Sequence, residues 1–189
     1  MNNILKLISG ILALVLIFGG AYFLYSKLSE QYAPDMLSID YESDGAVDAE
    51  VHPAPDFTVI DSSANEVKLS QMEGRPVVVN FWASWCPPCK NELPDFEKAY
   101  KKYGDDISFM MVNMTDGQQE TLEKAKAHIE QNRYTFPVYF DTEYSAATAY
   151  RVESLPTTYF VDADGNIVIY ARGMLNYKSL EEGIKMIQS

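Results

Sequence analysis

The sequence predicts an α/β domain with a mixed central sheet and helices on both faces, preceded by one transmembrane helix. Two observations support this. From residue 51 onward, strand-like and helix-like patterns alternate, and short turn sequences join some of the strand patterns. Before them, residues 7–25 form an uncharged, mostly apolar run. The predicted organisation is a cytoplasmic N-terminus (1–6), a transmembrane helix (7–25), an acidic tether (26–50) and the domain (51–189).

The apolar run is long enough to cross a membrane. As a helix, its 19 residues extend about 28 Å, close to a hydrocarbon core of roughly 30 Å. A cleavable signal peptide is the alternative, but no convincing Ala-x-Ala site follows the run. Residues 28–67 contain no Lys or Arg and ten Asp and Glu, so this stretch lacks the basic residues that hold a loop in the cytoplasm. We therefore expect a single-pass cell-membrane protein whose domain lies outside the cytoplasm.

The charge of the chain limits its partners. The formal net charge is −12, and nucleic-acid binding requires basic surface, so no nucleic-acid partner is expected. The lipid bilayer, contacted through residues 7–25, is an expected partner. The tether is interpreted as a solvated spacer because its acidic residues lie among Ser, Ala and Gly without a sustained period.

The helices and strands of the domain are predicted from the periodicity of the apolar residues and from the turn residues that separate them. Strand patterns flank a turn-rich Ser-Ser-Ala-Asn sequence and predict an N-terminal hairpin. A later apolar run without alternation predicts a buried central strand, and the helix after it ends before Gly104. Predicted strands are 56–60, 66–69, 77–82, 107–114, 137–140, 157–162 and 167–171. Predicted helices begin after the cysteines and run to 103, then span 118–133, 143–151 and 178–188.

The two cysteines of the chain, Cys86 and Cys89, are separated by two prolines at the turn from the central strand into a helix. Pro87 suits the first helical position. Cys86 just before it faces unpaired backbone N–H groups and the positive end of the helix, which favour a thiolate. Cys89, one turn later, is close enough to form a short disulfide. This pattern predicts reversible two-electron thiol–disulfide chemistry without a cofactor.

Other roles for the cysteines are less well supported. A structural zinc site needs about four ligands, and the histidines, His52 and His128, are far apart in sequence, so no metal site is expected. A metal-binding or metallochaperone module nevertheless stays a rival function. A peroxidase is disfavoured because Ala83 stands three residues before Cys86 where a threonine is required, and haem attachment would need histidine at Lys90.

Several motifs resemble the TlpA/ResA type of the thioredoxin superfamily, which are membrane-anchored thiol–disulfide oxidoreductases of the bacterial envelope. The resemblance covers about residues 53–189. It implies a thioredoxin-like fold with an N-terminal hairpin and a central αβ insertion. The motifs are Ala54-Pro55-Asp56-Phe57, Asn80-Phe81-Trp82-Ala83-Ser84-Trp85-Cys86-Pro87-Pro88-Cys89, Glu92-Leu93-Pro94 and Leu155-Pro156-Thr157.

The chemistry assigns Cys86 as the exposed nucleophile and Cys89 as the thiol that resolves a mixed disulfide. The resemblance implies a cis bond before Pro156, next to the disulfide, and main-chain pairing of Leu155 with the client. Trp85 is expected to form an apolar rim beside Cys86, with a core position as the alternative. Pro87 and Thr157 complete the predicted substrate-binding set.

Glu92 is a further candidate catalytic residue. On a helical wheel it borders the apolar face one turn beyond Cys89. Asn80 stands where cytosolic thioredoxins carry a buried aspartate, and TlpA/ResA proteins often carry a glutamate at the position of Glu92. A partly buried carboxyl there would exchange the proton of Cys89. An ordinary solvated glutamate is the alternative.

The direction of electron flow is predicted from charge. No histidine lies between the cysteines to stabilise a thiolate, and the acidic chain disfavours another negative charge. Both features favour a reductase of protein disulfides over a disulfide-forming oxidase. The resemblance implies apocytochrome c or a methionine sulfoxide reductase as client, and a membrane thiol carrier as electron donor.

Overall fold

The structure is a computed structural model that describes residues 52–188 and, nearer the N-terminus, residues 14, 16, 18–20 and 24. The chain divides into two units, 1–35 and 36–189. In the first unit, the described residues are helical and exposed. Among all described residues, no helix is both long and apolar enough to cross a membrane. The predicted segments 1–6 and 26–50, and most of 7–25, lie outside the described residues.

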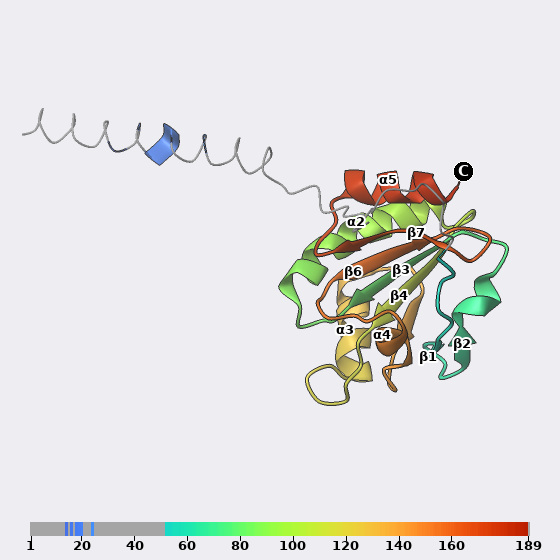
Figure 1. Cartoon of the computed structure of the whole chain (residues 1–189). Helices are drawn as coiled ribbons and strands as arrows, with labels where there is room; N and C mark the ends of the chain where they lie inside the picture. The colour runs from blue at the N-terminus through green and yellow to red at the C-terminus, as the bar shows by residue number, and fades with distance from the viewer. Residues whose placement is uncertain (1–13, 15, 17, 21–23, 25–51, 189) are drawn as a thin grey trace, which may run out of the picture. The chain divides into compact units, whose positions relative to one another are not determined.

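The second unit contains a seven-stranded mixed sheet in the order β2-β1-β5-β4-β3-β6-β7 (Figure 1). Strands β3, β4 and β5 are parallel, and β6 runs antiparallel to β3. The predicted mixed α/β sheet is therefore confirmed. The strands are β1 (Thr58–Ile60), β2 (Glu66–Lys68), β3 (Val77–Trp82), β4 (Ser108–Asn113), β5 (Val138–Phe140), β6 (Thr157–Val161) and β7 (Ile167–Arg172).

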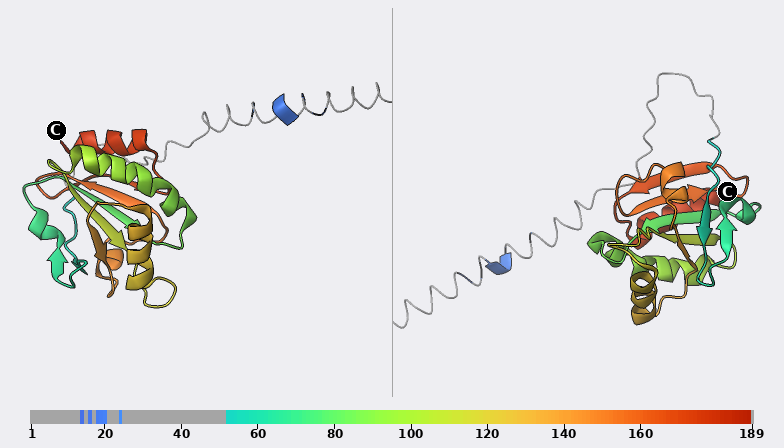
Figure 2. Two further views of the ribbon diagram at one scale, coloured as in Figure 1. Left: turned by 180° about the vertical axis from the view of Figure 1, so that it is seen from behind. Right: turned by 90° about the horizontal axis from the view of Figure 1, so that it is seen from below.

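Helices cover both faces of this sheet, as predicted. α2 (Pro87–Tyr103) and α5 (Tyr177–Ile187) lie side by side on one face (Figures 1 and 2). α3 (Leu122–Asn132) contributes Ala125 to the same hydrophobic cluster as these two helices. α4 (Ser145–Ala149) belongs to the cluster on the other face, and the 3-10 helix η1 (Leu69–Met72) contributes Leu69 to it. All six residues of β3 are buried, because the strand is covered on both sides.

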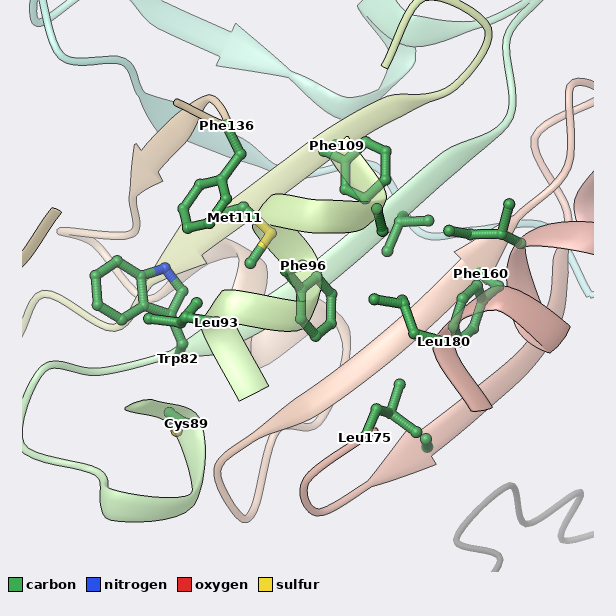
Figure 3. Close-up of a cluster of buried hydrophobic side chains, with 14 of the residues drawn as sticks. Trp82, Cys89, Leu93, Phe96, Phe109, Met111, Phe136, Phe160, Leu175 and Leu180 are labelled. Carbon is green, nitrogen blue, oxygen red and sulfur yellow. The ribbon is translucent and has the colours of Figure 1, made fainter. Parts of the chain in front are cut away.

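The core between α2, α5 and the sheet fixes the start of α2. Leu93 and Phe96 of α2 are fully buried, and Phe160 of β6 and Leu180 of α5 belong to the same cluster (Figure 3). Burial of each such side chain stabilises the fold by about 1.5–3 kcal/mol. In Figure 3, Cys89 lies at the end of this cluster, near Trp82 and Leu93. The cysteine-bearing end of α2 is therefore held against the sheet by the apolar face of the helix.

Both predicted hairpins are present. β1 and β2 pair antiparallel, with Val59 opposite Val67. β6 and β7 pair antiparallel across the turn at Gly165, whose φ of 83° favours glycine. α2 ends at Tyr103, as predicted.

Two predicted helices are shorter in the structure. The helix predicted from residue 118 begins at Leu122, because Oδ1 of Asp116 accepts hydrogen bonds from the N–H groups of Gln118 and Glu120 and forms a turn there. The helix predicted over 143–151 is reduced to α4. The Asp141 carboxylate accepts from two N–H groups at the start of α4, and Arg151 adopts a φ of 47° after its end.

Candidate active site

The turn after β3 places the two cysteines. The N–H of Cys86 donates to the carbonyl of Ala83 at 3.2 Å, which closes a turn between the strand and α2. Cys86 is the N-cap residue, and its Sγ accepts from the N–H of Cys89 at 3.3 Å. Pro87 occupies the first helical position, as predicted. The two sulfurs form a disulfide with a Cα–Cα distance of 5.3 Å.

The expectation that Cys86 is exposed is wrong for this disulfide form. Cys86 is 3% exposed and Cys89 is completely buried. The physical reason is that Sγ of Cys86 faces inward, where it is bonded to Cys89 and accepts from the first turn of α2. Trp85 is 43% exposed, so the alternative that it is a core residue is wrong. Pro87 is also exposed.

The loop before β6 lies at the same end of the strands as the cysteine turn. The Leu155–Pro156 bond is cis, as the resemblance implied. Thr157 pairs with Phe81, so the preceding Pro156 lies beside the end of β3 from which the cysteine turn departs. Leu155 is half-buried. Thr157 is buried, and its hydroxyl donates to the carbonyl of Ser154 at 2.8 Å, so its side chain shapes the loop.

Glu92 is fully buried, and the alternative of a solvated glutamate is wrong. Its Oε1 accepts from Nδ2 of Asn80 at 2.8 Å, and its Oε2 accepts from the N–H of Leu175 at 2.9 Å. Burial raises the pKa of Glu92 to about 8, although the hydrogen bonds from Leu175 and Asn80 oppose this, and nearby Asp95 adds to it. Glu92 is therefore mainly neutral at pH 7, one helical turn beyond Cys89.

The Asn80 amide is suited to a partner that changes its protonation state. Its Nδ2 donates to Glu92 and, at 3.0 Å, to the hydroxyl of Thr158. Its Oδ1 is buried and has no hydrogen-bond partner among the described residues. An amide carries donors on one side and an acceptor on the other. Rotation of the Asn80 amide would therefore present an acceptor to a protonated Glu92.

Sequence reasoning missed a second buried carboxylate, Glu120, which is also fully buried. It accepts hydrogen bonds from the N–H of Ser84 at 2.9 Å and its hydroxyl at 2.6 Å, and from Nδ2 of Asn113 at 2.7 Å. Glu120 lies in a polar stretch that was predicted to be helix, and nothing in that pattern separates it from its solvated neighbours. Its contact with Ser84, two residues before Cys86, appears only in the tertiary structure.

Three comparisons with known proteins agree with this geometry. Residues 51–170 match the model of the AhpC/TSA family. The thiol–disulfide oxidoreductase ResA of Bacillus subtilis is 30% identical over 138 residues, which cover 71% of this chain and 74% of that protein.

Solved structures show the same fold. The crystal structure of a putative thiol:disulfide interchange protein DsbE from Chlorobium tepidum has a TM-score of 0.66 and 27% identity, and the match covers 74% of this chain and 97% of that one. The exposed lipoprotein thioredoxin of Streptococcus pneumoniae has a TM-score of 0.61 and 29% identity, with 69% and 98% covered.

A Cys86–Cys89 disulfide at a strand-to-helix turn, a cis-proline beside that turn and these similarities lead to one assignment. The chain belongs to the AhpC/TSA family, and it is a thioredoxin-like thiol–disulfide oxidoreductase of the ResA/TlpA kind.

Proposed function

We propose that this oxidoreductase is a reductase of protein disulfides that acts outside the cytoplasm from a membrane anchor formed by residues 7–25. The observation that carries the direction of the reaction is the fully buried carboxyl of Glu92, one turn beyond Cys89. In this proposal, residues 1–6 are cytoplasmic and residues 26–50 are the tether. The pneumococcal relative, described as an exposed lipoprotein, supports a location outside the cytoplasm.

The forward reaction consists of two exchanges. The Cys86 thiolate attacks one sulfur of the client disulfide, forms a mixed disulfide with it and releases the other client sulfur as a thiolate. Cys89 then loses its proton, attacks Sγ of Cys86 and releases the second client sulfur. The client gains two electrons and, with two protons, becomes a dithiol, while Cys86 and Cys89 become the disulfide seen in the structure.

Glu92 serves both directions of this cycle. Its pKa of about 8 lies close to neutral pH, where a general acid or base is most effective. When the client is reduced, ionised Glu92 accepts the proton that Cys89 loses. When a donor thiolate attacks Cys86 and opens the disulfide, neutral Glu92 gives its proton to the departing Cys89 thiolate. The Asn80 amide is a hydrogen-bond partner in either protonation state.

The buried carboxyl also favours reduction over oxidation as the physiological direction. A protein disulfide is strongly oxidising when the protein stabilises the reduced form, commonly as a thiolate next to a cationic group. Glu92 supplies no positive charge to Cys89, and its ionised form repels a thiolate. We therefore expect the reduced form of this protein to give up its electrons readily.

The client is proposed to bind across Trp85, Pro87 and the loop at Leu155 and Pro156, with Thr157 fixing that loop. The exposed indole of Trp85 provides apolar contact, and main-chain pairing at Leu155 tolerates different sequences. Apocytochrome c or a methionine sulfoxide reductase is the proposed client, and a membrane thiol carrier the donor. Peroxide is not proposed as a substrate, because Ala83 occupies the position three residues before Cys86 where peroxidases of this kind need threonine.

The midpoint reduction potential tests the proposed direction. We expect a value near that of a thioredoxin, about −270 mV, when the purified domain equilibrates with glutathione or dithiothreitol buffers. A value near −120 mV would make the protein a disulfide-forming oxidase. Zinc and copper titrations of the reduced protein distinguish the proposed reductase from the alternative metal-binding module. The metal-binding module would require tight, stoichiometric binding.

Trapping of the mixed disulfide tests the roles of the two sulfurs. Cys89→Ser is expected to accumulate a mixed disulfide with a client peptide, because no second thiol resolves it. Cys86→Ser is the matched variant, because it makes the same sulfur-to-oxygen replacement at the other cysteine. It is expected to accumulate no mixed disulfide. Equal trapping by both variants would contradict the assignment of Cys86 as the nucleophile.

A further inference from the structure

The turn that carries Cys86 is held by a side chain from a distant part of the chain. Ser84 lies between Ala83 and Cys86, the two residues joined by the hydrogen bond that closes this turn. Both the N–H and the hydroxyl of Ser84 donate to the carboxylate of Glu120, 36 residues later. The main-chain and side-chain donors of Ser84 therefore both bind the buried carboxylate of Glu120.

Glu120 is itself fixed in place. Its N–H donates to Oδ1 of Asp116 at 2.8 Å, and its carbonyl accepts from the N–H of Gly117 at 2.9 Å. Its Oε1 also accepts from Asn113, the last residue of β4, which pairs with Trp82, the last residue of β3. The carboxylate thus connects the ends of two central strands to the cysteine turn.

Both oxygens of the Glu120 side chain act as acceptors. Three donors point at them, namely the N–H and the hydroxyl of Ser84 and Nδ2 of Asn113. Titratable groups near this end of the site include Lys90 and Glu92 on α2, His128 on α3, and Asp116 and Lys124 on either side of Glu120 in the chain. Burial lowers the pKa of His128, Lys90 lowers it further, and Glu120 opposes them, so His128 lies within electrostatic reach of both Lys90 and Glu120. Lys90 is exposed to water, whereas Glu120 is buried.

We propose that Glu120 is a positioning residue for the dithiol: its carboxylate holds the turn that presents Cys86, and its negative charge opposes ionisation of the Cys86 thiol. This proposal deepens the proposed function and rests on it. It places one acidic side chain, Glu120, near Cys86, just as Glu92 is near Cys89. The charge of Glu120, joined by that of Glu92 where Glu92 is ionised, disfavours the thiolates and so disfavours the reduced form relative to the disulfide. Glu120 itself transfers no proton and touches no reacting atom.

Glu120→Gln separates charge from geometry. Oε1 of the glutamine keeps the two hydrogen bonds that Oε1 of Glu120 accepts, from Ser84 N–H and from Asn113. Its Nε2 then donates to the Ser84 hydroxyl, which accepts as readily as it donates. Glu120→Ala removes both the charge and the three hydrogen bonds. Glu123→Gln is the matched control, since it removes the same charge from an exposed side chain three residues later.

The first test is the pH profile of Cys86 alkylation by iodoacetamide in the reduced protein. For Glu120→Gln we expect the midpoint to fall by roughly one pH unit, as expected when a nearby negative charge is removed. Because more thiolate stabilises the reduced form, the equilibrium with glutathione shifts up to about tenfold toward the dithiol. Glu123→Gln should leave both quantities unchanged. A Glu120→Gln profile that superimposes on the wild-type profile overturns the proposal.

The second test is the rate at which each variant reduces a disulfide-containing peptide. Glu120→Gln, which keeps the turn, is expected to stay within about twofold of wild type, whereas Glu120→Ala is expected to lose activity by about tenfold or more. Equal activity of the Gln and Ala variants overturns the positioning role. If Glu120→Ala does not fold, Ser84→Ala replaces it, because it removes only the hydroxyl donor, and a several-fold loss is then expected. A wild-type protein that reduces no peptide disulfide would refute the proposed function, yet the alkylation profiles would still test the charge of Glu120.

Discussion

The main-chain N–H of Leu175 donates a 2.9 Å hydrogen bond to Oε2 of Glu92, across 83 residues of sequence. Two residues before Leu175, the N–H of Gly173 donates to the carbonyl of Pro156 at 2.8 Å. Residues 173–175 therefore contact the cis-proline at one end and the buried carboxyl at the other. Through this loop, the proton carrier proposed for Cys89 is connected to the proposed client-binding segment.

The first prediction concerns stability and pH. The pKa of Glu92 is about 8 in the folded protein and near 4.5 in the unfolded chain, so between these values the folded state holds more protons. Stability contributed by this group is complete below about pH 4.5 and is lost as pH rises through about 8. As the pH rises between those limits, the free energy of unfolding of wild type should fall by roughly 4 kcal/mol relative to that of Glu92→Gln, because the glutamine side chain does not titrate.

Urea unfolding of the oxidised proteins at several pH values measures this difference. Glu182→Gln, on an exposed position of α5, is the matched control and should parallel wild type. If Glu92→Gln also parallels wild type across the whole range, the carboxyl does not titrate near pH 8.

The second prediction introduces a carboxyl at position 80. Asn80→Asp places a second buried acid in hydrogen-bond contact with Glu92, where both cannot ionise without strong repulsion. We expect the variant to be much less stable than wild type above about pH 8 and closer to it near about pH 5, because one shared proton relieves the repulsion. Asn80→Ala, which adds no acid, should lose stability without this pH dependence. Identical pH dependence in the two variants would contradict the prediction.

The third prediction concerns Trp85. Since its side chain is 43% exposed, Trp85→Ala should change the free energy of unfolding by less than about 0.5 kcal/mol. Reduction of a protein client should slow by about tenfold, whereas reaction of the disulfide with dithiothreitol should change little, because the small thiol needs no apolar rim. Met186→Ala on α5, 44% exposed in wild type, is the control and should leave client reduction unchanged. Equal slowing of client reduction and of the reaction with dithiothreitol would instead indicate a damaged disulfide site.

The fourth prediction concerns the contact between α5 and β6. A Cβ added at Gly183 would overlap the ring of Phe160, which is fully buried. Gly183→Ala gains about 1 kcal/mol of helix propensity, but overpacking of a tight core costs about 1–3 kcal/mol. We expect net destabilisation by roughly 1 kcal/mol in chemical unfolding, and Phe160→Leu in the same chain should relieve part of the clash. A Gly183→Ala variant more stable than wild type would show that the ring moves freely.

The sequence by itself determined the features that depend on neighbouring residues. The unalternating run Val77–Trp82 predicts a strand covered on both faces, and the Cys-Pro-Pro-Cys run predicts an N-cap and a first helical turn, because period and cap chemistry are local properties. The cis bond at Pro156 was expected from the family resemblance, since most bonds before proline are trans.

The tertiary structure alone decided what surrounds those features. A helical wheel gives the direction in which Glu92 points, but Leu175 and Asn80, which bury and bind it, come from other elements. The inward position of Cys86 and the contact of Glu120 with Ser84 likewise depend on packing between segments far apart in the chain. Burial and long-range hydrogen bonds set the protonation of a carboxyl, and neither is encoded in the period of its own helix or loop.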